Sequence, residues 1–167
     1  MPLKILSYDS DSAINYASKW AYARNPLYYD FDPIGGDCTN FTSQCLFAGS
    51  KIMNHSAVTG WYYYSVNKRS ASWTSVAYFY QFLISNKSVG PYGHPVDISS
   101  TAAGDFIQLS TVEPYFHHSC IIVKKEHETQ LDKIFIACHT YDAYMKPLSE
   151  YPINKMRCIK IDGIRKF

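Results

Sequence analysis

The hydrophobic periodicity of the chain changes about halfway along its 167 residues. In the first half, apolar residues recur at spacings of three and four, which is typical of amphipathic helices. In the second half, short apolar and β-branched runs alternate with turn residues, which is typical of strands. Helices followed by a meander of strands predict an α+β domain, with helices packed on an antiparallel sheet.

Three helices are expected from this pattern. The first follows the cap-rich segment Asp9–Ser12 and stops before Pro26. The second covers about 38–49 and the third about 75–86. The expected strands are Phe106–Leu109, Ser119–Val123, Lys133–Cys138 and Met156–Ile161. No repeat or long linker divides the chain, so we expect one domain over residues 1–167.

Composition narrows the class of protein. Hydrophobic residues make up 47% and charged residues 18%, and no window reaches the roughly 18 apolar residues that a membrane span needs. The start, Met1–Asp9, lacks the apolar core of a secretory signal. We therefore expect a cytoplasmic protein by default, or a secreted one if a leader has been trimmed.

Charge and cysteine usage exclude several further classes. The net charge is +2 and the basic residues are scattered, whereas nucleic-acid binding favours a concentrated basic stripe. The five cysteines contain no CxxC pair, which argues against a disulfide framework and a zinc finger. We expect no metal, no organic cofactor and a monomer. Four cysteines have apolar neighbours and are interpreted as buried: Cys45, Cys120, Cys138 and Cys158.

Cys38 is the exception, because polar residues flank it inside the segment Gly35–Leu46. It stands at a turn-to-helix junction, where unpaired backbone N–H groups and the helix dipole stabilise a negative sulfur. Two glycines before it permit unusual backbone angles. The pattern predicts a nucleophilic thiolate at Cys38.

Two histidines border strands that could lie near this helix start. His118 opens the apolar run 119–123, and His139 closes the run 134–138. Histidine can take a thiol proton and deliver it to a leaving amine, and a third polar group commonly orients it. His139 is well placed for the orienting role if the two strands are adjacent, and Asp142 is the alternative. His117 points to the opposite face from His118, so only one of the two can meet the cysteine.

Other residues could complete such a site. The backbone N–H of Cys38 would form one side of an oxyanion hole, and Asp37 or Tyr28 could contribute to substrate or oxyanion binding. The aromatic run Trp61–Tyr64 either belongs to the core or lines a groove for sugar or peptide.

Several segments together resemble the cysteine amidase domain family of the papain-like clan, which includes the NlpC-type peptidoglycan peptidases. The segments that carry the resemblance are Arg24–Tyr28, Gly35–Leu46, Gly104–Gln108, His118–Ser119, His139–Asp142 and Lys146–Leu148. The resemblance implies a circularly permuted papain-like fold. It also implies that Cys38 is the nucleophile, that His118 rather than His117 is base and acid, and that His139 orients the imidazole.

The function expected from these observations is cysteine-dependent hydrolysis of an amide bond through a thioester. The resemblance points to a peptide substrate, such as cell-wall peptidoglycan. A non-catalytic cell-wall or glycan-binding module with the same fold is the alternative, using the aromatic surface near Trp61–Tyr64. Acyl transfer by the same residues is a third possibility.

Overall fold

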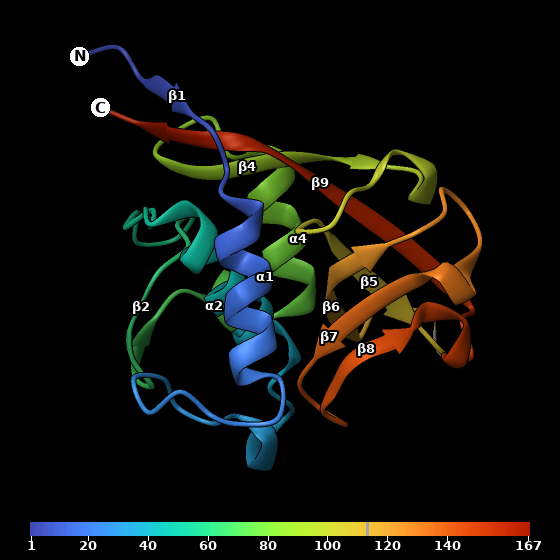
Figure 1. Cartoon of the computed structure of the whole chain (residues 1–167). Coiled ribbons are helices and arrows are strands. Elements are labelled where there is room, and N and C mark those ends of the chain that lie inside the picture. The colour runs from blue at the N-terminus through green and yellow to red at the C-terminus, as the bar shows by residue number, and fades with distance from the viewer. Residues whose placement is uncertain (113) are drawn as a thin grey trace.

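The computed structural model describes residues 1–112 and 114–167. A seven-stranded sheet dominates it, with strands in the order β1-β9-β5-β6-β7-β8 and with β4 also pairing β9. Every strand pair is antiparallel, and Figure 1 shows the helices gathered beside the twisted sheet. The predicted α+β fold with an antiparallel sheet is confirmed.

The strands of this sheet are β1 (Lys4–Leu6), β4 (Gly90–Val96), β5 (Phe106–Ser110), β6 (His118–Lys125), β7 (Ile134–Cys138), β8 (Ala143–Pro147) and β9 (Lys155–Lys166). A separate hairpin pairs β2 (Tyr63–Ser65) with β3 (Lys68–Arg69). The α-helices are α1 (Ser10–Trp20), α2 (Cys38–Ser50), α3 (Ala71–Thr74) and α4 (Val76–Ser85). Short 3-10 turns are η1 (Asp32–Ile34), η2 (Ile98–Ser100), η3 (Leu131–Lys133) and η4 (Leu148–Glu150).

The sheet separates two apolar clusters, because successive strand residues point to opposite faces. The helix-side cluster packs α1, α2 and α4 on the sheet and includes Phe41, Cys45, Leu46, Phe79, Leu83, Phe106, Ile121 and Ile159. The far-side cluster contains Ile107, Leu109, Cys120, Ile122, Ile134, Ile136, Cys138, Ala143, Leu148 and Cys158. The four cysteines expected to be buried are buried, and all five cysteines are free.

Several elements differ from the sequence expectation. Helix α1 ends at Trp20, whereas the helical spacing in the sequence extends the expected helix through Arg24 to just before Pro26. The short strands β1, β2 and β3 were missing from the prediction, and so were β4 and β8. Gly90–Val96 contains two glycines and two prolines, and residues 139–148 are rich in polar and turn-forming types. Tertiary pairing overrides these weak local preferences, since β9 holds β4 and β7 holds β8.

None of the described helices is both long and apolar enough to cross a membrane. The two ends of the described chain lie side by side, because β1 pairs with the end of β9 (Figure 1).

Candidate active site

The first turn of α2 lies where strands β6 and β7 separate. The ladder between these strands begins at the pair Ile121 and Ala137. Ser119 lies two residues before this pair on β6, and His139 follows directly after the end of β7; both residues contact α2. Oγ of Ser119 lies 3.1 Å from Oγ1 of Thr39. The His139 ring stacks on the ring of Phe41 in α2, with the two centroids 4.1 Å apart. The helix start therefore occupies the opening between the two strand ends.

Cys38 is the first residue of α2 and faces the backbone around His118. Its Sγ lies 4.0 Å from the carbonyl oxygen of His117 and 3.8 Å from Oγ1 of Thr39. A hydrogen bond from the backbone N–H of Ser119 also favours the charged form of this sulfur. The residues on both sides of His118 thus contact Cys38, so the structure brings the predicted nucleophile to the start of β6.

The resting state of Cys38 differs from the sequence expectation. Its side chain is buried, with 7% of the residue exposed. Burial raises the pKa of the Cys38 thiol above its ordinary value and outweighs the hydrogen bonds of Ser119 and Thr39, which lower it. A neutral thiol is therefore the resting form, because desolvation here is stronger than the stabilisation that a helix start supplies.

His118 lies on the far-side face of β6, together with Cys120. Its ring centroid is 5.7 Å from that of Tyr151, and 8% of the residue is exposed. Nε2 of His118 is buried and has no hydrogen-bond partner among the described residues. Buried polar atoms are usually paired, so this unpaired ring nitrogen marks His118 as a candidate functional residue.

Burial is the main cause that lowers the pKa of His118 to about 4, with smaller contributions from the neighbouring His117 and Lys146. The imidazole is therefore neutral at pH 7 and able to accept a proton. Together with the raised thiol pKa, this describes a neutral thiol and a neutral imidazole at rest. His117 itself is exposed, and its Nε2 lies 3.1 Å from the backbone N of Thr111.

His139 binds Asp37, the residue that precedes Cys38 in the sequence. Nδ1 lies 2.5 Å from Oδ2 of Asp37, and Nε2 lies 2.8 Å from the carbonyl oxygen of Trp20. Both nitrogens therefore have partners other than His118. The adjacency of β6 and β7, on which the predicted orienting role depended, is present.

Asp37 is buried and serves as an anchor for the loop before α2. Its Oδ1 accepts hydrogen bonds from the backbone N of Phe31 and from Nδ2 of Asn40, both at 2.8 Å. Its own backbone N donates to Oγ1 of Thr140 at 2.9 Å. The Asp37 carboxylate is therefore engaged by other groups of the protein, and these hydrogen bonds fix the position of Asp37 next to Cys38.

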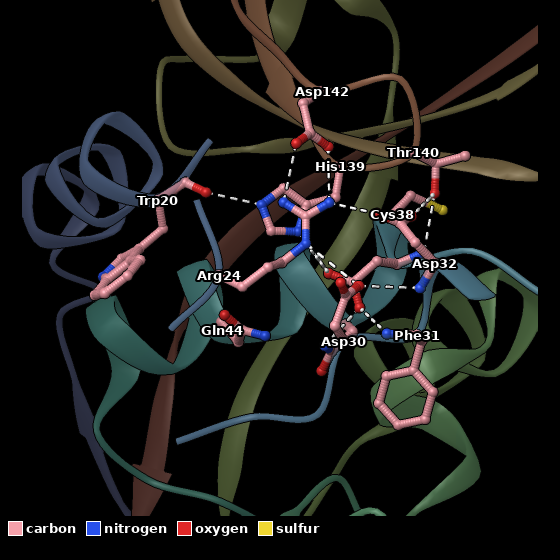
Figure 2. A network of polar contacts seen from close by, with 12 residues as sticks. Trp20, Arg24, Asp30, Phe31, Asp32, Cys38, Gln44, His139, Thr140 and Asp142 are labelled. Carbon is pink, nitrogen blue, oxygen red and sulfur yellow. Dashed lines mark hydrogen bonds and ion pairs between the residues drawn. The ribbon is translucent and has the colours of Figure 1, made fainter. Parts of the chain in front are cut away.

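Arg24 connects this anchor to three further carboxylates, those of Asp30, Asp32 and Asp142, which are labelled in Figure 2. Its guanidinium binds both carboxylate oxygens of Asp142 at 3.0 Å and also pairs with Asp32. Its Nε lies 3.3 Å from Asp30 and 3.7 Å from Asp37. Asp142, the alternative orienting residue, is thus engaged by Arg24.

The remaining polar residues of the cysteine segment have structural partners on the helix side. Oδ1 of Asn40 accepts from the Trp73 indole at 2.9 Å, and Oγ of Ser43 accepts from the Trp61 indole at 3.0 Å. Gln44 accepts from the Tyr16 hydroxyl at 2.6 Å. These polar residues around Cys38 therefore also hold α2 in its buried position through hydrogen bonds.

The predicted aromatic surface is divided between core and exterior. Trp61 is fully buried, whereas Tyr64 is 55% exposed. The Tyr28 ring packs on Tyr63 and Trp73, with centroids 5.1 and 5.8 Å apart. A hollow of about 440 Å³ is lined by Pro26, Leu27, Tyr28, Tyr29, Asp30, Tyr63, Tyr64, Ser65 and Val66.

Sequence reasoning missed several residues that shape the site. Thr140 and Asn40 act through hydrogen bonds to Asp37, and Arg24 through its ion pairs. Arg24 and Asn40 belong to segments that carried the family resemblance, but a resemblance does not show which partners they bind. Lys146 lies near His118. Its place in one of the segments that carried the family resemblance was its only signal in the sequence.

The comparison with known proteins covers all of these residues. Residues 7–161 match a family model described as "Putative amidase domain". The chain is 31% identical over 147 residues to a Bacillus subtilis (strain 168) protein described as "Uncharacterized protein YhbB". The match covers 86% of this chain and 45% of that protein, so the chain spans less than half of the relative's length. No solved structure matches the chain.

Proposed function

The chain belongs to this amidase-domain family, and on that premise we propose that it hydrolyses an amide bond with Cys38 as nucleophile and His118 as base and acid. One observation carries the proposal. The sulfur of Cys38 contacts the backbone on both sides of His118, and Nε2 of His118 is buried with no hydrogen-bond partner among the described residues. These contacts support the proposal that the proton acceptor and the nucleophile share one water-poor site.

The proposed reaction begins from the neutral pair. As the sulfur of Cys38 attacks the amide carbon, its proton passes to Nε2 of His118, and the carbonyl oxygen becomes an oxyanion. The backbone N–H of Cys38, in the first turn of α2, is the proposed donor to that oxyanion. Collapse of this intermediate breaks the C–N bond, and His118 gives its proton to the departing amine.

A thioester remains on Cys38 after the amine departs. Water then attacks the thioester carbon while His118 takes one of its protons. The C–S bond breaks, the acid product leaves, and the proton returns from His118 to the sulfur. Neither half of this cycle needs a cofactor, because acid, base and nucleophile are side chains of the chain itself.

We assign His139 a positioning task in this reaction. It binds Asp37 directly, and Asp37 precedes Cys38 and anchors the loop before α2. The hydrogen bonds of His139 therefore support a role in positioning the Cys38 sulfur rather than in orienting the His118 ring. Thr140 supports the same residue through its bond to the Asp37 backbone.

The fold relation and the substrate follow from the family resemblance and remain proposals. A helix that begins with the cysteine and meets the ends of two antiparallel strands is consistent with a permuted papain-like, NlpC-like arrangement. Peptides of the cell wall are the substrate class that this resemblance implies. We therefore propose a peptide amide, with peptidoglycan fragments as the first substrates to test.

The decisive experiment compares two cysteine variants on cell-wall peptide fragments. Cys38→Ala removes the nucleophile and is expected to lower turnover roughly a thousandfold or more without unfolding the chain. Cys158→Ala removes a buried sulfur on β9 and is expected to keep turnover. Mass spectrometry should also detect an acyl adduct on Cys38 during turnover. Full activity of folded Cys38→Ala would refute the proposal.

A non-catalytic glycan-binding module is the second candidate, because four tyrosines line the hollow of about 440 Å³ described above. Aromatic faces with polar tips are suited to sugar rings. This candidate predicts that insoluble cell wall binds Cys38→Ala as well as the native chain, and that Tyr64→Ala weakens the binding. Wall binding together with no turnover of any wall fragment would favour it over hydrolysis.

A further inference from the structure

A β-bulge in strand β8 lies next to the candidate site. Ile136 of β7 pairs with Lys146, whereas Cys138 pairs with Ala143. One residue of β7 therefore faces two residues of β8 in this interval. Met145, one of the two β8 residues of the bulge, has a φ of 57°, a left-handed conformation that costs a side-chain-bearing residue roughly 1–2 kcal/mol. Bulges often occur next to active sites, where they redirect a side chain.

The bulge changes the face of the sheet on which Lys146 lies. In a regular strand, residues 143 and 146 would point to opposite faces, because side chains alternate. Here Ala143 and Lys146 both pair with residues of the far-side face of the sheet, because their partners Cys138 and Ile136 belong to the far-side cluster. His118 lies on that same face of β6. The strained residue thus places a lysine on the face that carries the proposed base.

The surroundings of Lys146 place its charge close to His118. Its Nζ lies 4.1 Å from the ring centroid of Tyr151, and that ring is 5.7 Å from the ring of His118. The two distances put the ammonium within about 10 Å of the His118 ring. The charge is near enough to lower the pKa of His118, after the larger effects of burial and His117.

In the part of the chain that the structure describes, no carboxylate neutralises the charge of Lys146. Within residues 1–112 and 114–167, no Asp or Glu forms an ion pair with it, and its one recorded contact is with the Tyr151 ring. Arg24, the cation near Asp37, differs because it pairs with four carboxylates. Lys146 is a half-buried residue whose ammonium has no carboxylate partner among the described residues, so an incoming anion could form a charge-assisted hydrogen bond with it.

We propose that Lys146 is a substrate-binding residue that takes a carboxylate of the substrate. The preferred amides then carry a negative charge close to the bond that is cleaved. An extended residue spans about 3.5 Å, so a separation of at most about 10 Å between Lys146 and His118 places this carboxylate within about three residues of the scissile amide. This inference rests on the proposed function, because it assigns specificity to the same site.

The experiment compares two amides that differ in one charge, N-succinyl-alanine p-nitroanilide and N-acetyl-alanine p-nitroanilide. The native chain is expected to cleave the succinyl compound with a kcat/KM about tenfold higher, which corresponds to one charge-assisted hydrogen bond. Lys146→Gln should abolish this preference, so that the variant cleaves the two compounds with similar kcat/KM. Lys87→Gln, which changes an exposed lysine after α4, should keep the preference.

Three results would overturn the inference: equal cleavage of both compounds by the native chain, a preference that survives in Lys146→Gln, or equal losses on both compounds in that variant. The last result would indicate a role in folding or in oxyanion binding. If neither anilide is cleaved, the proposed function is in question and binding decides the inference separately. Succinate should then shift the His118 ring resonances of the native chain but not of Lys146→Gln, and succinamide should shift neither. No shift with succinate would reject the carboxylate site.

Discussion

Nδ1 of His139 lies 2.5 Å from Oδ2 of Asp37, and both side chains are only 1% exposed. The other ring nitrogen of His139 lies 2.8 Å from the carbonyl oxygen of Trp20, the last residue of α1. The imidazole therefore connects the end of one helix to the residue that precedes the start of another. Because water cannot reach this pair, its loss leaves buried polar groups unsatisfied.

This buried pair should contribute far more stability than an exposed pair of the same type. Asp37→Ala is expected to lower the free energy of unfolding by about 3 kcal/mol, because it removes the acceptor for several buried donors. The matched control is Asp162→Ala, which breaks an exposed pair with His94 whose atoms are 2.7 Å apart. That change should cost less than about 1 kcal/mol. Urea unfolding of both variants measures the difference, and equal losses would contradict the buried-anchor role.

The two glycines before Asp37 should tolerate alanine differently. Gly35 and Gly36 have φ values of 111° and 105°, so alanine is strained at either position by roughly 1–2 kcal/mol. A Cβ on Gly35 meets nothing within 4 Å, but one on Gly36 would lie 3.0 Å from Oγ1 of Thr140. That hydroxyl accepts the Asp37 backbone N–H.

Gly36→Ala is therefore expected to lower thermal stability more than Gly35→Ala and also to reduce turnover, because it displaces the loop that positions Cys38. Melting curves and initial rates for the two variants provide the comparison. Identical behaviour of the two alanine variants would show that the Thr140 contact does not position the site.

His118 should make the protein sensitive to acid. Its folded pKa of about 4 lies below the ordinary value near 6.5, so the unfolded chain binds the proton more tightly. The stabilisation is complete above about pH 6.5 and is lost as the pH falls through about 4, and the shift corresponds to roughly 3 kcal/mol.

The measurement is urea unfolding at several pH values between 7 and 4 for the native chain and for His118→Asn. Because the other titrating groups are common to both, the difference between the two curves isolates His118. The native chain should lose stability more steeply over this window. Parallel curves would mean that His118 does not have a depressed pKa in the folded chain.

The reactivity of Cys38 should depend on pH as expected for a neutral thiol. Because burial raises the pKa of this thiol, alkylation by iodoacetamide should accelerate continuously from pH 7 to beyond pH 9. Cys38 should still react first, since it is 7% exposed and the other cysteines are at most 2% exposed. Peptide mapping after brief labelling identifies the adduct, with Cys38→Ala as the control. A rate that is constant between pH 5 and 8 would reveal a preformed thiolate instead.

Local patterns in the sequence were sufficient to predict much of the fold. The helix at 38–50 and the strands around Phe106, Ile121, Ile136 and Ile159 follow from apolar periodicity, which depends on neighbouring residues alone. Strand β4 could not be recognised in this way, since its two glycines and two prolines are turn formers and β9 alone holds it in the sheet. The β8 bulge was equally invisible, because a register shift depends on the partner strand.

By itself, the sequence determined which side chains are chemically able to act and that a cysteine begins a helix, because residue chemistry and helix starts are local properties. The tertiary structure alone decided the environment of those side chains. Cys38 is buried and its thiol pKa is raised, His139 binds Asp37 across 102 positions of the chain, and a bulge turns Lys146 toward the face of His118. Burial, long-range hydrogen bonds and strand register are set by residues distant in sequence, so no local pattern could have specified them.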